Sequence, residues 1–251
     1  MTNDGKRSRV VGFADSPHPT QPPRYHPPMT YAVIFDIDGV LIDSYQAHFE
    51  SWRQIGRQFN QDITEQQFAG SFGRTSKDII RLWFGALLGD KLTDQHSAEI
   101  DEHKEAASRE VVRKTKPVMP GAVALIDALY SAGFKLGVGS SGPPANVELS
   151  LQLLERVPKF GAKVTGMDVT GGKPDPQVFQ IAASRLGVEP AKCAVIEDAP
   201  AGVAAANAAG MTSIALLGTA PREKLAAARR IVGSLKELTP ADIAQLIDAP
   251  R

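Results

Sequence analysis

Residues 31–44 read YAVIFDIDGVLIDS, and this stretch decides the fold. Its first five residues form a continuous apolar run rich in β-branched and aromatic side chains, which predicts a strand buried on both faces. Asp36 and Asp38 follow directly, and Gly39 lets the chain turn there. Ligands of open α/β sheets bind beyond the carboxyl ends of the strands, so the two carboxylates are candidates for a functional site. Taken alone, Asp-x-Asp is more often an acidic turn that ends a strand.

Strand-like and helical segments alternate along most of the chain. Similar apolar runs recur at 134–139, 193–196 and 212–217. Helical segments lie between and after them. One covers 177–186, with Asp175 as its expected N-cap and Gly187 at its end; another stops at Gly210; the last begins at Thr239, with Pro240 behind it. This alternation predicts an α/β fold with a doubly wound parallel sheet.

One region interrupts the alternation. From residue 44 to about 116 the sequence has no strand-like run, and aromatic or apolar residues recur every three or four positions from 45 to 59, which indicates an amphipathic helix. Further helical patterns follow at 64–70, 75–88 and 93–114. We therefore expect a helical cap domain at 45–116, inserted after the first strand into a core formed by 29–44 and 117–251. Residues 1–28 are Pro-rich and predict a disordered extension.

The composition excludes several classes of protein. The chain has 28 Lys and Arg against 28 Asp and Glu, without a basic block, which argues against a nucleic-acid or membrane-surface protein. Cys193 is the single cysteine, so an internal disulfide or a cysteine zinc site is excluded. There is no secretory h-region and no apolar run of roughly 18 residues. We expect a cytoplasmic enzyme, monomeric or weakly dimeric, with Trp83 and Phe84 in the cap core or in an interface.

Three further segments carry polar residues at strand ends. The first is GSSG at 139–142, where Ser140, Ser141 and the backbone N–H groups could hold an anion. The second is TGGKPDP at 170–176, which contains Lys173, and the third is IEDAPAG at 196–202, with Glu197 and Asp198. Singly, these have ordinary explanations: a Ser-rich turn, a solvated lysine and a helix cap.

The three segments indicate a functional site more strongly when they are considered together with Asp36 and Asp38. A parallel sheet brings the carboxyl ends of its strands to one edge, so all four segments can converge on one cleft. Clustered carboxylates repel one another unless a cation lies among them, and hard oxygen ligands favour Mg²⁺. Carboxylates, Mg²⁺, a lysine and a hydroxyl are the equipment of phosphoryl transfer.

The four segments, in this order, resemble the four motifs of the haloacid dehalogenase superfamily. The resemblance covers essentially all of residues 31–220 and implies a Rossmann-like core. The helical insertion resembles the cap of the branch that contains β-phosphoglucomutase and the phosphoglycolate-phosphatase-like enzymes. The haloalkanoate dehalogenases are a poorer match, because they lack the second aspartate of the first motif, which is Asp38 here.

The resemblance implies a role for each motif residue. Asp36 would be the nucleophile that forms an aspartyl-phosphate. Asp38 would be the general acid and base, a task that suits a carboxyl group whose pKa is raised by burial and neighbours. The implied Mg²⁺ ligands are Asp36, the main-chain carbonyl of Asp38, Asp198 and, directly or through water, Glu197. The implied ligands of the phosphoryl oxygens are Ser140, Ser141 and Lys173.

The resemblance reaches into the cap with weaker signals. His48 and Trp52 reproduce a spacing found in β-phosphoglucomutase, Arg74 resembles its arginine for the distal phosphate, and Lys104 resembles a cap lysine. Each has an ordinary alternative. His48 flanks an apolar stripe, so it can simply pack, and Lys104 lies in a charged helix whose face we expect to be solvated. Trp52 and Phe49 are expected in the cap core. Arg74 stands in a Gly-bearing turn, where function is favoured.

The predicted activity is Mg²⁺-dependent hydrolysis of a phosphomonoester on a small phosphorylated metabolite, such as a sugar phosphate or phosphoglycolate. A phosphohexomutase of the β-phosphoglucomutase type is the alternative, and His48, Trp52 and Arg74 support it. A non-catalytic binding module is disfavoured, because every catalytic position holds a competent residue. The natural substrate stays open, since specificity depends on cap and loop contacts.

Overall fold

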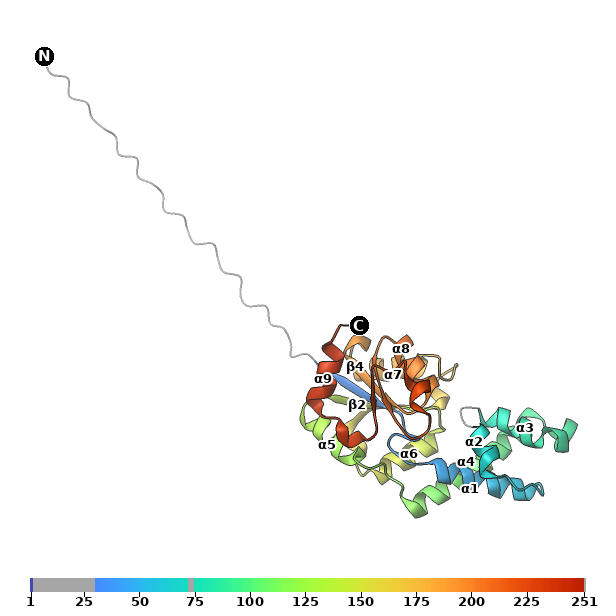
Figure 1. Ribbon diagram of the computed structural model, residues 1–251. Helices are drawn as coiled ribbons and strands as arrows, with labels where there is room; N and C mark the ends of the chain where they lie inside the picture. The colour runs from blue at the N-terminus through green and yellow to red at the C-terminus, as the bar shows by residue number, and fades with distance from the viewer. Residues whose placement is uncertain (2–29, 72–74, 251) are drawn as a thin grey trace.

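The computed structural model describes residue 1 and residues 30–71 and 75–250 of the chain. The predicted fold class is confirmed: six parallel strands form one sheet that is flanked by helices on both faces (Figure 1). The sheet order is β3-β2-β1-β4-β5-β6, so β1 is central. The strands are β1 (Ala32–Phe35), β2 (Lys135–Gly139), β3 (Phe160–Val164), β4 (Cys193–Glu197), β5 (Thr212–Leu216) and β6 (Arg230–Val232).

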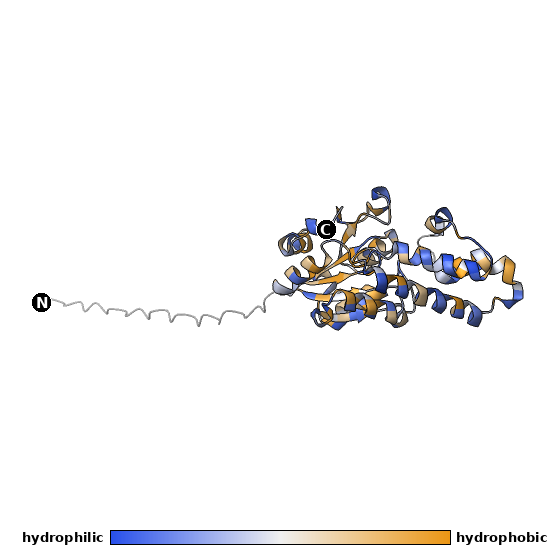
Figure 2. Ribbon diagram, turned by 90° about the horizontal axis from the view of Figure 1, so that it is seen from below, coloured by the Kyte–Doolittle hydropathy of each residue, from blue (hydrophilic) through white to orange (hydrophobic). Residues whose placement is uncertain are grey.

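Both faces of the central strand are buried, which explains its continuous apolar run. Val33 and Phe35 join the cluster on one face of the sheet, and Ala32 and Ile34 join the cluster on the other. The first face is covered by α5 (Ala122–Ser131), α6 (Pro144–Leu153) and α9 (Pro240–Asp248), and the second by α7 (Gln177–Leu186) and α8 (Pro200–Ala208). Figure 2 shows the apolar strands enclosed by helices with polar outer faces.

The strands β3 and β6 were not among the sequence predictions. Both lie at the edges of the sheet. The β3 sequence FGAKV alternates between buried and more exposed positions, and β6 has only three residues and begins with an exposed arginine. Edge strands face solvent on one side and carry polar residues, so they lack the continuous apolar signal of the central strands.

The predicted helix ends hold with one correction. Gly187 ends α7 in the left-handed conformation, and Thr239 caps α9 in a capping box with Asp242. The N-cap position of α7 belongs to Pro176, not to Asp175. Asp175 lies one residue earlier, and its Oδ1 still accepts a hydrogen bond from the Gln177 N–H at 2.9 Å.

Four helices stand between β1 and α5 and form a separate lobe, which projects to one side of the sheet (Figure 1). They are α1 (Tyr45–Gln58), α2 (Glu65–Ser71), α3 (Ser76–Leu88) and α4 (Asp94–Thr115). Most of their buried apolar side chains form one cluster: Phe49, Trp52, Ile55, Phe68, Ile79, Ile80, Phe84 and Ile100. Trp83 packs against that cluster. Trp83 and Phe84, expected either in the cap core or in an interface, therefore belong to the core of the lobe.

The boundaries of the cap domain and the oligomeric state stay predictions. The predicted disordered extension, apart from residue 1, lies outside the described residues. Within the described part of the chain, no helix combines the length and the apolar character needed to cross a bilayer. Single 3₁₀ turns lie at Gly89–Lys91, Val157–Lys159, Gly166–Asp168, Pro190–Lys192, Arg222–Leu225 and Leu235–Glu237.

Candidate active site

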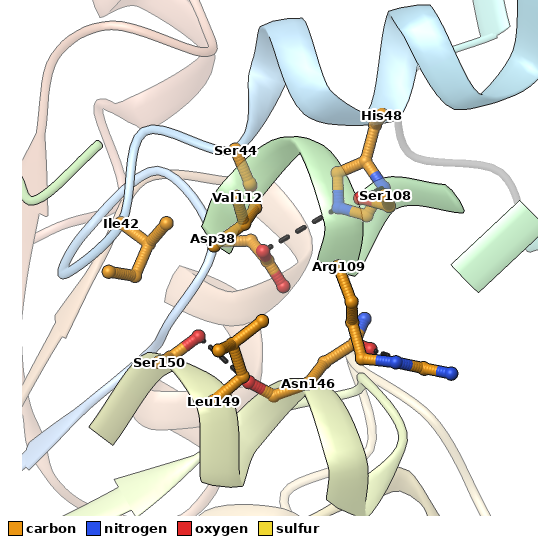
Figure 3. A pocket seen from close by; sticks show the side chains of 10 residues that line it. All are labelled: Asp38, Ile42, Ser44, His48, Ser108, Arg109, Val112, Asn146, Leu149 and Ser150. Atoms are coloured by element: carbon orange, nitrogen blue, oxygen red, sulfur yellow. Dashed lines mark hydrogen bonds and ion pairs between the residues drawn. The ribbon is translucent and has the colours of Figure 1, made fainter. Parts of the chain in front are cut away.

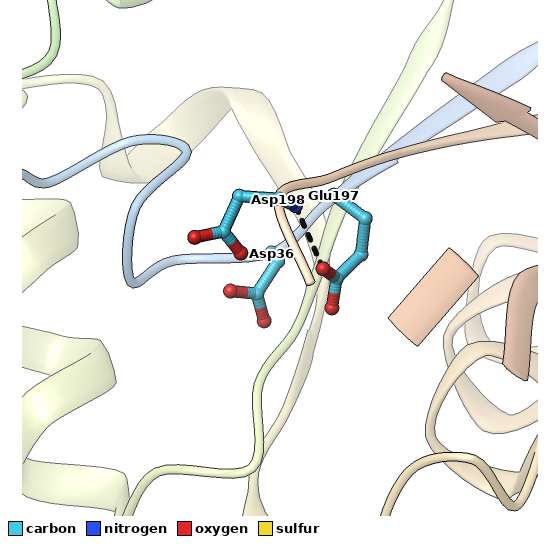
Figure 4. Close-up of side chains that lie close together, drawn as sticks. All are labelled: Asp36, Glu197 and Asp198. Carbon is cyan, nitrogen blue, oxygen red and sulfur yellow. Dashed lines mark hydrogen bonds between the residues drawn. The ribbon is translucent and has the colours of Figure 1, made fainter. Parts of the chain in front are cut away.

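The carboxyl ends of β1 and β4 bring three carboxylates together. In the register of these strands Phe35 lies beside Ile196, so the next residues, Asp36 and Glu197, stand at the same level. Asp198 follows immediately. All three acids are buried, and each offers one carboxylate oxygen that lies within 4.8 Å of the other two (Figure 4). The predicted convergence of the first and fourth motifs is therefore present.

Lys173 enters this cluster from the loop before α7. Its Nζ lies 2.6 Å from Asp36 Oδ1 and 2.7 Å from Glu197 Oε1. The lysine and both carboxylates are almost fully shielded from solvent, and the ammonium also lies 5.0 Å from the centre of the Phe179 ring. One buried ammonium thus bridges acids from two neighbouring strands, which holds the Asp36 carboxylate in a fixed orientation.

Burial and mutual repulsion leave the cluster electrostatically unbalanced. Burial raises the pKa of Asp36 to about 7 against the attraction of Lys173, and repulsion from Glu197 adds to the rise. Burial, followed by repulsion from Glu197 and Asp36, raises the pKa of Asp198 well above its usual range. For Lys173, attraction by the acids outweighs burial and raises its pKa.

The raised pKa values show that full ionisation of the three carboxylates is disfavoured in this buried place, because their combined charge would exceed that of the one ammonium by two. An excess of this size, carried by hard oxygen atoms, fits a divalent cation such as Mg²⁺. The three carboxylates are therefore suitable ligands for the predicted Mg²⁺. Asp38 is outside this carboxylate group, and its main-chain carbonyl stays a predicted ligand.

Two glycines make room for the acids, and sequence reasoning passed over this role. A Cβ on Gly202 would lie 1.7 Å from Glu197 Oε1, and one on Gly39 would lie 1.9 Å from Asp198 Oδ2. Gly39 also has a φ of +77°, which favours glycine. Glu197 Oε2 accepts hydrogen bonds of 2.7 Å from the N–H groups of Asp198 and Ala199, so its carboxylate is held at the start of α8.

Thr219 is a further residue that the motifs did not indicate. Its hydroxyl donates to Asp198 Oδ2. Thr219 lies in the loop after β5, where the sequence has no acidic or lysine signal to mark it. Its proximity to the acidic cluster depends on the order of the strands, since β5 lies directly beside β4.

The hydroxyl loop lies at the end of β2, next to β1. Ser140 is buried, its N–H donates to the Val164 carbonyl at 3.0 Å, and its Oγ accepts from the Gly142 N–H at 3.0 Å. A Cβ added to Gly142 would lie 3.2 Å from Ser140 Oγ and 3.8 Å from Asp38 Oδ2. The loop and Asp38 are therefore neighbours. Ser141 is exposed.

Asp38 lies beside a cap residue and is not one of the three clustered acids. Its Oδ1 lies 3.5 Å from His48 Nε2, and His48 Nδ1 lies 2.9 Å from Lys104 Nζ. Burial acts to raise the pKa of Asp38, but hydrogen bonds from His48 and Ser44 and the charge of Lys104 lower it to about 2. The expectation that the surroundings raise this pKa is wrong, because the cap supplies a hydrogen-bond donor and a nearby ammonium.

The expectation of a solvated Lys104 is also wrong. Its side chain is buried, with Nζ 2.6 Å from Glu105 Oε1 and 5.4 Å from the centre of the Trp52 ring. The face of α4 that carries Lys104 lies against α1. The charged sequence pattern of α4 therefore did not indicate that this lysine is buried. His48 faces Asp38, and its contact with a substrate stays a prediction. Trp52 and Phe49 lie in the cap core, as predicted.

A pocket between the cap and the core adjoins these residues (Figure 3). Asp38 and His48 face each other across it, and Asn146 and Arg109 lie on its far side, joined by a hydrogen bond of 2.9 Å. The complete lining is Asp38, Ile42, Ser44, His48, Ser108, Arg109, Val112, Asn146, Leu149 and Ser150. Asn146 and Arg109 were missed, because only the packing of α4 on α6 brings them together. Arg74, the predicted ligand of a distal phosphate, lies outside the described residues.

Comparisons with known proteins agree with this site. The family described as haloacid dehalogenase-like hydrolase matches residues 31–210. β-Phosphoglucomutase of Bacillus subtilis is 33% identical over 214 residues, which cover 83% of this chain and 91% of that protein. Validoxylamine A 7'-phosphate phosphatase of Streptomyces hygroscopicus is 31% identical over 84% of this chain and 96% of that protein. A crystal structure of β-phosphoglucomutase from Clostridium difficile superposes with a TM-score of 0.76 at 25% identity, covering 88% of this chain and 98% of that one.

Proposed function

Because the chain belongs to the haloacid dehalogenase-like hydrolase family, we propose that it is a Mg²⁺-dependent phosphatase of small sugar phosphates that works through an aspartyl-phosphate. Relatives named phosphorylated carbohydrates phosphatase and hexitol phosphatase B support this substrate class, and a further relative is named validoxylamine A 7'-phosphate phosphatase. The observation that carries the proposal is the buried cluster of Asp36, Glu197 and Asp198, bridged by Lys173 at the carboxyl edge of the sheet.

The metal would be held by Asp36, Asp198 and the main-chain carbonyl of Asp38, with Glu197 directly or through water. When bound, Mg²⁺ would neutralise charge on the phosphoryl oxygens and on the attacking carboxylate. The fixed position of Lys173 supports a second task, since its ammonium both orients Asp36 and can neutralise a phosphoryl oxygen. We assign the remaining oxygens to Ser140 and to the turn that contains Ser141.

In the first step Asp36 attacks the phosphorus atom, and the bond between phosphorus and the ester oxygen breaks. Asp38 is ionised in the free protein; it takes up a proton when the negatively charged phosphate ester binds beside it, and gives that proton to the leaving alcohol. In the second step Asp38 takes a proton from water, which attacks the aspartyl-phosphate and releases phosphate and free Asp36. The contact between Asp38 and His48 supports this assignment, because it places the second aspartate beside a cap residue, at the pocket between core and cap.

A phosphohexomutase remains the second candidate. It is favoured by the 33% identity to β-phosphoglucomutase and by the cap residues His48 and Lys104, which surround Asp38. In that reaction the aspartyl-phosphate passes to a sugar hydroxyl and not to water. The difference depends on how well the closed cap excludes water.

The test is an assay of phosphate release with Mg²⁺ on a panel of hexose, pentose and hexitol phosphates. We expect release that Asp36→Asn abolishes. Incubation with β-glucose 1-phosphate and its bisphosphate activator separates the two candidates: glucose 6-phosphate as the main product supports the mutase, and free phosphate supports the hydrolase. If Asp36→Asn keeps full activity, the assignment of the nucleophile is wrong.

A further inference from the structure

A run of hydrogen bonds joins the cap helix α4 to the core helix α6 beside the pocket. Glu105 on α4 is buried, and both of its carboxylate oxygens have partners: Oε1 accepts from Lys104 Nζ and Oε2 accepts from Asn146 Nδ2, each at 2.6 Å. Asn146 stands in the first turn of α6, and its Oδ1 accepts from Arg109 of α4 at 2.9 Å (Figure 3). The amide of one core residue thus satisfies two charged groups of the cap.

The same run continues to the second aspartate. Lys104 Nζ lies 2.9 Å from His48 Nδ1, and His48 Nε2 lies 3.5 Å from Asp38 Oδ1. An ammonium can only donate, so His48 Nδ1 accepts and the ring N–H is on Nε2, which faces Asp38. Ser108 Oγ lies 3.4 Å from the same Nδ1, but Lys104 is nearer, so its position favours the tautomer of His48 that presents an N–H to Asp38.

The position of Lys104 depends in turn on the core. A lysine side chain is flexible and adopts one rotamer only where several partners hold it. All three partners, His48, the Trp52 ring and Glu105, are in the cap, and Glu105 is the one that also contacts the core. Asn146 is the link between Glu105 and the core, so separation of α4 from α6 would leave a buried carboxylate without its neutral partner and free to turn.

We propose that Asn146 and Glu105 are positioning residues, which let Asp38 reach its working orientation only while α4 lies on α6. The inference rests on the proposed function, because that function makes Asp38 the acid and base. Asn146 touches neither Asp38 nor the acidic cluster and acts through Glu105, Lys104 and His48. Through the hydrogen bond between Asn146 and Glu105, proton transfer by Asp38 requires that α4 of the cap lies on α6 of the core.

The first test is Asn146→Ala, with Gln152→Ala as the matched control. Gln152 is also an amide on α6 that donates to a glutamate, Glu148, at 3.0 Å, but it is exposed and remote from the cap. We expect kcat for phosphate release to fall on the order of 10- to 100-fold in Asn146→Ala, as for other losses of orientation, with KM little changed. Gln152→Ala should keep wild-type kcat. Wild-type kcat in Asn146→Ala would overturn the proposal.

A second readout does not depend on activity. The chain has two tryptophans, Trp52 and Trp83, and both belong to the cap. Lys104 lies over the Trp52 ring, so a shift of Lys104 changes the surroundings of an indole. We expect Asn146→Ala, a change in the core, to alter the tryptophan emission, and Gln152→Ala to leave it unchanged. Identical emission from Asn146→Ala and the wild type would contradict the proposed coupling.

Exchange of the amide at position 146 and the carboxylate at position 105 distinguishes a positioning role of these residues from a general loss of folding. Asn146→Asp alone places a carboxylate against Glu105 and should lower kcat at least as far as Asn146→Ala. With Glu105→Gln added, the new amide donates to the carboxylate at 146 while its oxygen still accepts from Lys104, so most of kcat should return. A double variant no faster than Asn146→Asp would overturn the proposal. If wild-type protein releases no phosphate from any substrate, the proposed function fails, and the emission test still decides whether the contact reaches Lys104.

Discussion

Gly202→Ala sets two physical effects against each other. Gly202 lies in α8, and alanine is intrinsically better in a helix than glycine by about 1 kcal/mol. The added Cβ, however, would stand 1.7 Å from Glu197 Oε1 and 2.0 Å from Cδ, far inside van der Waals contact. Glu197 is itself fixed by two backbone hydrogen bonds of 2.7 Å, so it cannot move without losing them.

We expect steric overlap to win. Overpacking of a close-packed site costs about 1–3 kcal/mol, so after the gain in helix propensity the variant should lose up to about 2 kcal/mol in the free energy of unfolding. Displacement of the Glu197 carboxylate should also raise the Mg²⁺ concentration needed for half-maximal activity by roughly 10- to 100-fold.

The assay compares urea unfolding and Mg²⁺ titration of phosphatase activity for Gly202→Ala and Gly85→Ala. Gly85 lies inside α3, where an added Cβ meets nothing within 4 Å, so Gly85→Ala should gain about 0.5–1 kcal/mol and keep the wild-type Mg²⁺ dependence. If Gly202→Ala is also stabilised and needs no more Mg²⁺ than the wild type, the assigned place of Glu197 beside the metal is wrong.

Two further predictions concern buried ionisable groups. Lys173→Met removes an ammonium that pairs with both Asp36 and Glu197, and breaking such a buried pair should cost about 3–5 kcal/mol in the metal-free protein, measured by urea unfolding. Part of this loss should return with Mg²⁺. A loss below about 1 kcal/mol would show that the pairing does not stabilise the fold. Burial disfavours the charged thiolate and raises the pKa of the Cys193 thiol from 9.0 to about 12. At about pH 8 the native protein should therefore resist a thiol reagent that labels the unfolded chain at once. Rapid labelling of the native protein would contradict the burial of β4.

The parts of the site that the sequence predicts are those set by local signals. Asp36 and Asp38 follow an apolar run, and Glu197 and Asp198 follow another, so the order of strands and acids in the chain is enough to place them at one edge. Lys173 belongs to the same set because a short loop delivers it to that edge.

The parts that the sequence does not predict depend on contacts between distant segments. Lys104 meets His48 across 56 positions, so its burial is invisible in the pattern of α4 alone. Asn146 and Glu105 are ordinary polar residues until α4 packs on α6. The pKa of Asp38 illustrates the same limit: hydrogen bonds from His48 on α1 and from Ser44 at its N-cap position lower this pKa, whereas burial alone would have raised it.

The most direct test of the account is a crystal structure of the protein soaked with Mn²⁺ as a substitute for Mg²⁺, located by anomalous scattering. The account predicts one strong peak in contact with the carboxylates of Asp36 and Asp198, at the edge where β1 and β4 end. A peak bound elsewhere, with these two carboxylates free of metal, would contradict the claim that this cluster is the catalytic centre.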